Sequence, residues 1–93
     1  MTHHGRRDNN HAEIRDGLRE CGYFVIDLAD VGNGVPDLLV ISSCAMMLME
    51  VKRPGENLTE MERLFHATCP SKCVVVHTVE EAVMLMRVQE SEE

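Results

Sequence analysis

The sequence predicts one α/β domain in which helices flank a mixed β-sheet. Segments in which apolar residues recur at helical spacing alternate with short runs of aliphatic and β-branched residues, which predict strands. The 93 residues suit a single domain over 1–93, and they contain no internal repeat. The predicted order is helix 10–21, strands 23–28, 36–41 and 46–52, helix 59–66, strand 73–77 and helix 83–88.

The first helix is predicted from the spacing of its apolar residues. Ile14, Leu18 and Cys21 fall on one helical face, and Gly22 is suited to end the helix. Residues 1–8 ahead of it are polar, and they predict a loose N-terminus.

Three predicted strands follow this helix. The run 23–28 is apolar and partly β-branched, and the loop 30–34 after it holds two glycines and an asparagine. Pro36 fits the start of the second strand, because the first residue of a strand need not donate a ladder hydrogen bond. The third strand has two alternating faces. One face would carry Met46, Leu48, Glu50 and Lys52, and the other Met47, Met49 and Val51.

The second and third helices are predicted from their caps. Thr59 and Glu62 have the spacing of a capping box, as do Thr78 and Glu81, and a helical apolar pattern follows each pair. The last five residues, 89–93, predict a solvated acidic tail.

Composition restricts the classes of function. The formal net charge of -7 taken alone argues against a nucleic-acid partner, but five glutamates lie within 80–93, so the rest of the chain is only weakly acidic. The absence of Trp, with only three other aromatic residues, argues against base stacking. No apolar run reaches the roughly 20 residues of a membrane span, and no signal segment is apparent, so we expect a soluble cytoplasmic protein.

The four cysteines are expected to be reduced thiols, because nothing indicates an oxidising compartment. Cys69 and Cys73, with His66 and His77, would be the ligands of an alternative zinc site. The three residues between the cysteines differ from the usual two-residue knuckle, and a cysteine that opens an apolar strand is ordinarily a buried thiol. We therefore expect these cysteines and histidines to be structural.

Asp37 on the second strand, with Glu50 and Lys52 on the third, forms the candidate active site. Side chains two apart on a strand point the same way, and pairing of the two strands brings Asp37 alongside. Two carboxylates suit a hard divalent cation such as Mg²⁺ or Mn²⁺, and a neighbouring ammonium can serve a water molecule. This set predicts phosphodiester hydrolysis. The alternative from the residues alone is a structural ion pair.

These segments resemble the PD-(D/E)XK nuclease superfamily, most closely the small stand-alone VRR-NUC domains found in phages and bacteria. The resemblance covers roughly residues 6–88 of the chain. The matching segments are Gly34-Val35-Pro36-Asp37-Leu38-Leu39-Val40, Met49-Glu50-Val51-Lys52-Arg53-Pro54, and Leu58-Thr59 leading to Glu62. It implies a restriction-endonuclease-like α-β-β-β-α-β core with a further helix, in a bacterial or phage-infected host cytoplasm.

The resemblance also implies the role of each central residue. Asp37, Glu50 and the backbone carbonyl of Val51 would bind Mg²⁺ or Mn²⁺, and Lys52 would serve the attacking water.

Similar proteins place a glutamate on the first helix, beside the metal directly or through water. Glu13 is the best match for this metal-binding and catalytic position, with Asp8 and His11 as rivals. The alternative for Glu13 is an exposed charge that answers the helix dipole.

Three further residues are weaker candidates. Glu62 stands where the family often has a glutamine, and its capping role explains it equally well. Arg53 and Arg63 would contact DNA phosphates, although arginines at such positions are more often plain solvated charges.

The resulting expectation is a homodimeric DNA endonuclease acting on branched or duplex substrates, similar to Holliday-junction resolvases. A domain of this size has a small core, which favours a partner subunit. One alternative is a nuclease-fold module that binds nucleic acid or protein without cleaving. Another is a nuclease subunit that is active only with a partner enzyme.

Overall fold

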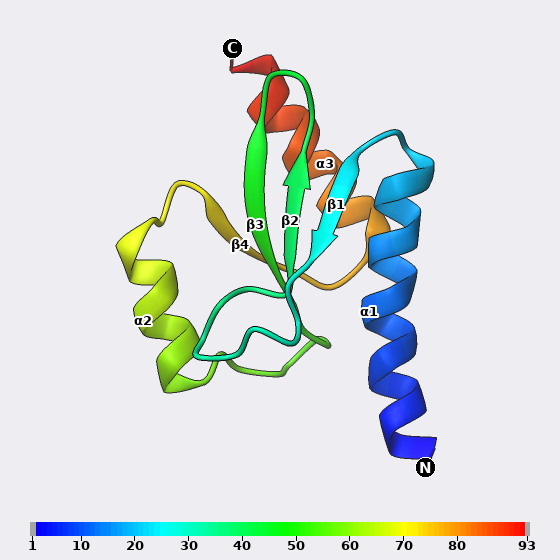
Figure 1. The fold of residues 1–93 in the computed structure, drawn as a ribbon, viewed down its shortest axis with the longest axis vertical. Helices are drawn as coiled ribbons and strands as arrows, with labels where there is room; N and C mark the ends of the chain where they lie inside the picture. The colour runs from blue at the N-terminus through cyan, green and yellow to red at the C-terminus, as the bar shows by residue number, and fades with distance from the viewer. Residues whose placement is uncertain (1, 93) are drawn as a thin grey trace.

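The chain forms a four-stranded sheet with three helices (Figure 1). The computed structural model describes the backbone of residues 2–92 and the side chains of residues 10–92. The elements are α1 (Thr2–Glu20), β1 (Phe24–Asp27), β2 (Leu38–Ile41), β3 (Met46–Val51), α2 (Glu60–Thr68), β4 (Cys73–Val76) and α3 (Val79–Ser91). The predicted order of helices and strands is confirmed.

The sheet is mixed, as predicted. Its strand order is β1-β2-β3-β4, with β1–β2 and β2–β3 antiparallel and β3–β4 parallel. Leu38 pairs with Met49, and Leu48 pairs with Cys73, which sets the register across the sheet. Because side chains alternate along each strand, this register decides which residues share a face.

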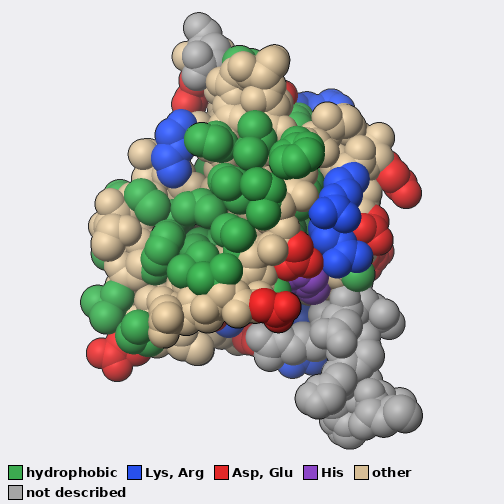
Figure 2. Space-filling view, viewed as in Figure 1, with side chains coloured by type: hydrophobic (Ala, Val, Ile, Leu, Met, Phe, Trp, Pro, Cys, Tyr) green, Lys and Arg blue, Asp and Glu red, His purple; other side chains and the backbone are tan. Residues whose placement is uncertain are grey.

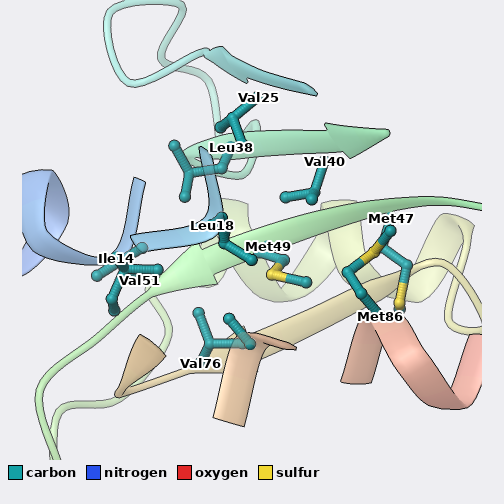
Figure 3. Packing of buried hydrophobic residues seen from close by; sticks show 11 residues of the cluster. Ile14, Leu18, Val25, Leu38, Val40, Met47, Met49, Val51, Val76 and Met86 are labelled. Atoms are coloured by element: carbon teal, nitrogen blue, oxygen red, sulfur yellow. The ribbon is translucent and has the colours of Figure 1, made fainter. Parts of the chain in front are cut away.

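One face of the sheet carries the hydrophobic core beneath α1 and α3 (Figure 3). Ile14 and Leu18 from α1 point toward Val51 and Met49 on β3, and Met86 from α3 lies against Met47. All of these side chains are buried, and the two helices also contact each other. The prediction that Met47, Met49 and Val51 share one face of the third strand is therefore confirmed, and this face is the core side.

The opposite face of the sheet is apolar at one end and polar at the other. Its apolar end carries Phe24, Ile26, Leu39, Ile41, Met46 and Leu48. Figure 2 shows hydrophobic side chains gathered on this side of the molecule, where Phe24 is 66% and Met46 51% exposed. The polar end carries Glu50 and Lys52 and lies near α2. We call the six residues of the apolar end the bare apolar face.

Two helices differ in length from the prediction. α1 begins at Thr2, within the segment predicted to be loose over 1–8. α3 runs from Val79 to Ser91, so most of the tail predicted over 89–93 is helical. Its start is set by Thr78, whose hydroxyl accepts from the Glu81 amide. Near its end, the Tyr23 hydroxyl donates to Glu90 at 3.0 Å, which gives this acidic turn a partner in the fold. No helix of residues 2–92 is long and apolar enough to cross a membrane.

Gly34 joins the loop before β2 to the first turn of α2. Its φ is +82°, and a Cβ added there would lie 2.4 Å from the Met61 carbonyl oxygen. Only glycine permits both the left-handed backbone and this close approach. Since α2 contains no fully buried residue, this backbone contact is one of the features that hold it to the domain.

We predict that Gly34→Ala lowers the free energy of unfolding by about 2–4 kcal/mol, from left-handed strain plus displacement of α2. Urea unfolding followed by circular dichroism measures the loss. Gly55→Ala is the matched control, because Gly55 has a φ of +86° and nothing within 4 Å of an added Cβ. Its loss should be only about 1 kcal/mol. Equal losses in the two variants would show that the Met61 contact contributes nothing.

Candidate active site

Asp37 lies directly before the first residue of β2, Leu38. The β2–β3 register, extended by one residue beyond the Leu38–Met49 pair, sets Asp37 against Glu50. The carboxylate of Asp37 accepts a hydrogen bond from the Val51 amide at 2.9 Å, and its backbone carbonyl accepts from the Leu28 amide at 2.7 Å. The Asp37 side chain thus takes the place of a backbone acceptor for the Val51 amide. Regular pairing between β2 and β3 therefore begins at Leu38, and not at Pro36 as predicted.

Glu50 is a buried carboxyl group with only 2% of its surface exposed. Burial, followed by the neighbouring carboxylates of Asp37 and Glu62, raises its pKa to about 9, against the opposing effect of Lys52. Its Oε1 atom has no hydrogen-bond partner among the described residues. Burying an acceptor that has no hydrogen-bond partner costs free energy. The carboxyl group at this position is therefore more stable when it is protonated or bound to a ligand than as a bare anion.

Lys52 is buried among three carboxylates, with 3% of its side chain exposed. Its Nζ atom lies 2.9 Å from Glu62 Oε1 and 4.0 Å from an oxygen of both Glu50 and Glu56. The Lys52 amide donates to the Val76 carbonyl at 3.0 Å, which fixes this end of β3 against β4. Lys52 therefore has one close ion pair, with Glu62, and two further carboxylates at 4.0 Å.

Glu62 both caps α2 and pairs with Lys52. Its Oε1 atom accepts from the Thr59 amide at 2.8 Å, and its own amide donates to the Thr59 hydroxyl, so the predicted capping box is confirmed. Burial opposes ionisation of this group, but the Thr59 amide and Lys52 together hold the pKa of Glu62 below its usual range. The capping box thus keeps Glu62 charged and aimed at Lys52.

A pocket of about 210 Å³ lies beside Asp37. Val51 lines it from β3, Arg53 lines it from the loop after β3, and Asn10 and His11 line it from α1. The remaining lining residues are Ala29 and Glu56. The pocket is small and polar, and neither Glu50 nor Lys52 is among its lining residues.

The structure separates the rival residues of the first helix. His11 lines the pocket, and Asp27 Oδ2 lies 2.9 Å from its Nε2 atom. Glu13 is exposed and does not line the pocket. The Asp8 side chain lies outside the described residues. Arg53 lines the pocket, whereas Arg63 is exposed on α2 away from it.

Asn10 and His11 are pocket residues that sequence reasoning undervalued. They stand four and three residues before the buried Ile14, so they share its helical face, while Glu13 immediately precedes it. Helical spacing from Ile14 therefore indicates that Asn10 and His11 lie on the side of α1 that faces the sheet.

The candidate site offers few protein ligands for a divalent cation. Among residues 10–92, no three His, Cys, Asp or Glu side chains are grouped to hold a metal ion. Asp37 and Glu50 would supply two carboxylates and Val51 a backbone carbonyl, and Mg²⁺ commonly retains several waters and needs only one or two carboxylates. The partnerless Oε1 of Glu50 beside Asp37 is the observation that favours a cation here.

We predict that the metal-free protein loses stability as pH rises from about 4.5 to about 9. In this window folded Glu50 keeps a proton that the unfolded chain has released, so each pH unit lowers the free energy of unfolding by about 1.4 kcal/mol at most. Urea unfolding in EDTA at several pH values measures the slope. Glu50→Gln should flatten it, and an unchanged slope in that variant would assign the pH dependence to other groups.

The comparisons with known proteins leave the family open. No protein-family model matches the chain, and a search of curated proteins finds no match.

Proposed function

We propose that the protein is a Mg²⁺- or Mn²⁺-dependent endonuclease of the PD-(D/E)XK kind that hydrolyses DNA phosphodiester bonds. The observation that carries the proposal is the convergence of Asp37, Glu50 and Lys52 at one end of the sheet, with an oxygen of Glu50 left without a partner. A restriction-endonuclease-like core is part of this proposal, and the mixed sheet with helices is compatible with it.

Each residue of the site has a distinct part in the proposed reaction. Asp37 and Glu50, with the carbonyl of Val51, would hold the cation, and Glu50 gives up its proton when it does so. A bound Mg²⁺ or Mn²⁺ supplies positive charge that stabilises the phosphodiester under attack. Lys52, held by Glu62 at 2.9 Å, would orient the attacking water by donating a hydrogen bond to it, and the proton of that water would pass to solvent. Breaking the P–O bond then yields two DNA ends without a covalent intermediate.

The pocket beside Asp37 gives the DNA backbone a place to approach. Arg53 lines it and is half exposed, so its guanidinium can reach a phosphate. Asn10 and His11 provide further donors from α1. Arg53 supplies positive charge to a pocket that also contains the carboxylates of Asp37 and Glu56.

Cleavage of defined DNA substrates tests the proposal. The full chain is incubated with linear, nicked, flapped and four-way DNA in Mn²⁺, Mg²⁺ or EDTA, beside Asp37→Ala. We expect cutting that requires the metal and is lost in the variant. Cutting that persists in EDTA, or in Asp37→Ala, would reject this site as its source, and no cutting of any substrate would reject the activity for the isolated chain.

A non-cleaving binding module is the second candidate. It is favoured by the ion pair of Lys52 with Glu62, which satisfies the lysine within the fold. Calorimetric titration with Mn²⁺ separates the two functions. A site that binds metal gives heat that disappears in Asp37→Ala, whereas a purely structural cluster gives equal heats in both proteins.

We also propose that two copies pair through the bare apolar face. A chain of net charge -7 repels its own copies, so association is favoured where neither surface carries charge. None of the six residues of this face is charged, and a hollow of about 600 Å³ bordered by Leu39, Met46 and Leu48 would receive side chains of the other copy. Lys72 is the charged residue at the border of this hollow. An exposed apolar surface of this kind marks an interaction site in soluble proteins.

We predict that Met46→Lys converts a dimer into a monomer, because it places a charge on the bare apolar face, opposite Ile41. Light scattering coupled to gel filtration measures the mass. Met84→Lys is the matched control: Met84 is 64% exposed on α3, and Met46 51% exposed on β3. A wild-type monomer, or a dimer unaffected by Met46→Lys, would contradict this interface.

A further inference from the structure

Two cysteine sulfurs lie next to each other at the junction of α2 and β4, away from the proposed nuclease site. The Sγ atoms of Cys69 and Cys73 are 2.9 Å apart. Cys69 caps the C-terminus of α2, and Cys73 is the first residue of β4. The separation already approaches the distance at which a disulfide, with a bond of about 2.05 Å, can close without a large movement.

The backbone between the two cysteines fixes this approach. The Lys72 amide donates to the Cys69 carbonyl at 3.0 Å, closing a tight turn, and the Lys72 carbonyl accepts from the Leu48 amide at 2.8 Å, which anchors the turn to β3. The pair is therefore positioned by hydrogen bonds of the fold and not by a flexible loop.

The two thiols differ in exposure. Cys69 is half-buried, whereas only 7% of Cys73 is exposed. Burial, with the adjacent Cys69, raises the pKa of the Cys73 thiol to about 12. Cys69 is thus the sulfur that an external reagent reaches first, and Cys73 is the resolving sulfur behind it.

We propose that Cys69 and Cys73 form a reversible dithiol–disulfide site that exchanges with small-molecule disulfides of the glutathione type. The Cys69 thiolate attacks one sulfur of the reagent, breaking its S–S bond and releasing one thiol. Cys73 then loses its proton to the released thiolate or solvent and attacks Cys69 Sγ, expelling the second thiol. The protein gives up two electrons and two protons, and the reagent becomes two thiols.

We expect the disulfide to link the C-terminal end of α2 covalently to the sheet. α2 has no fully buried residue and is attached at its start by the Gly34 contact and the Lys52–Glu62 pair. A disulfide would attach its other end to β4. Closing this short loop should raise the midpoint of thermal unfolding by roughly 5–15 °C relative to the reduced protein.

Peptide mapping of the full chain after treatment with oxidised glutathione tests the proposal. Trypsin cuts after Arg63, Lys72 and Arg87, so it separates Cys69 from Cys73 unless a disulfide joins the two peptides. We expect the joined pair, with the mass of two hydrogens lost, and its disappearance after treatment with a reducing agent. Cys69→Ser should abolish the joined pair and the rise in unfolding midpoint.

The exposed Cys21 and Cys44 provide the internal control. A Cys21→Ser, Cys44→Ser double variant should still form the bridge, which excludes rearrangement through either thiol. If Cys69 and Cys73 remain as thiols or stop at glutathione adducts after Cys21 and Cys44 of the wild type have reacted fully, the site is not a disulfide-forming pair.

Discussion

Glu50→Gln is expected to reduce metal-dependent DNA cleavage by at least about a thousandfold while leaving the fold intact at neutral pH. At that pH the raised pKa keeps Glu50 protonated in the metal-free protein, and glutamine has nearly the same shape as the protonated acid. The variant therefore retains the packing at a position that is only 2% exposed. It cannot become an anion, so the cation loses a charged ligand and the phosphate loses its stabilising charge.

Cleavage rates in Mn²⁺ and circular dichroism of the same samples measure the two parts of this prediction. Glu60→Gln is the control, because Glu60 lies exposed on the first turn of α2, two residues before the capping residue Glu62. It should cleave like the wild type. Near-normal cleavage by Glu50→Gln would remove Glu50 from the metal site.

Lys52→Met is expected to remove cleavage to a similar degree and also to lower the free energy of unfolding by about 2–4 kcal/mol. Methionine keeps the length of the buried stem but not the ammonium that would serve the attacking water. Glu62 then loses its 2.9 Å partner and keeps its hydrogen bond from the Thr59 amide. Removing one member of a buried pair leaves the other charge uncompensated, which is the source of the stability loss.

A second substitution separates stability from chemistry. Lys52→Met combined with Glu62→Gln removes the unpaired charge, so it should recover much of the stability while remaining inactive. Lys72→Met is the surface control, since Lys72 is exposed and donates to Gln89. If the double variant regained cleavage along with stability, Lys52 would be structural and not part of the reaction.

The order of elements and the faces of the strands could be predicted because they depend on local patterns. The alternation along β3 places Met47, Met49 and Val51 on one face, and Thr59 with Glu62 predicts the start of α2. The meeting of Asp37 with Glu50 also followed from strand pairing. Its role in catalysis stays a prediction, as do those of Lys52 and the metal.

Contacts between distant segments could not be predicted. Nothing near Glu62 in the sequence indicates that it pairs with Lys52, because that contact depends on how α2 is placed by the Gly34 backbone. The hydrogen bond between His11 and Asp27, which joins α1 to β1, also could not be predicted from the sequence. The end of α3 could not be predicted, because polar residues continue a helix when a tertiary partner such as Tyr23 holds it.

The hydrogen bond from the Val51 amide to the Asp37 carboxylate couples the alignment of two strands to the proposed chemistry. Sliding β2 by one residue along β3 would turn Asp37 to the core side of the sheet and leave this amide unsatisfied. The carboxylate that would bind the cation therefore also fixes the register between β2 and β3. A protein engineer who moves this acid to another position would have to supply both a new ligand and a new means of aligning the strands.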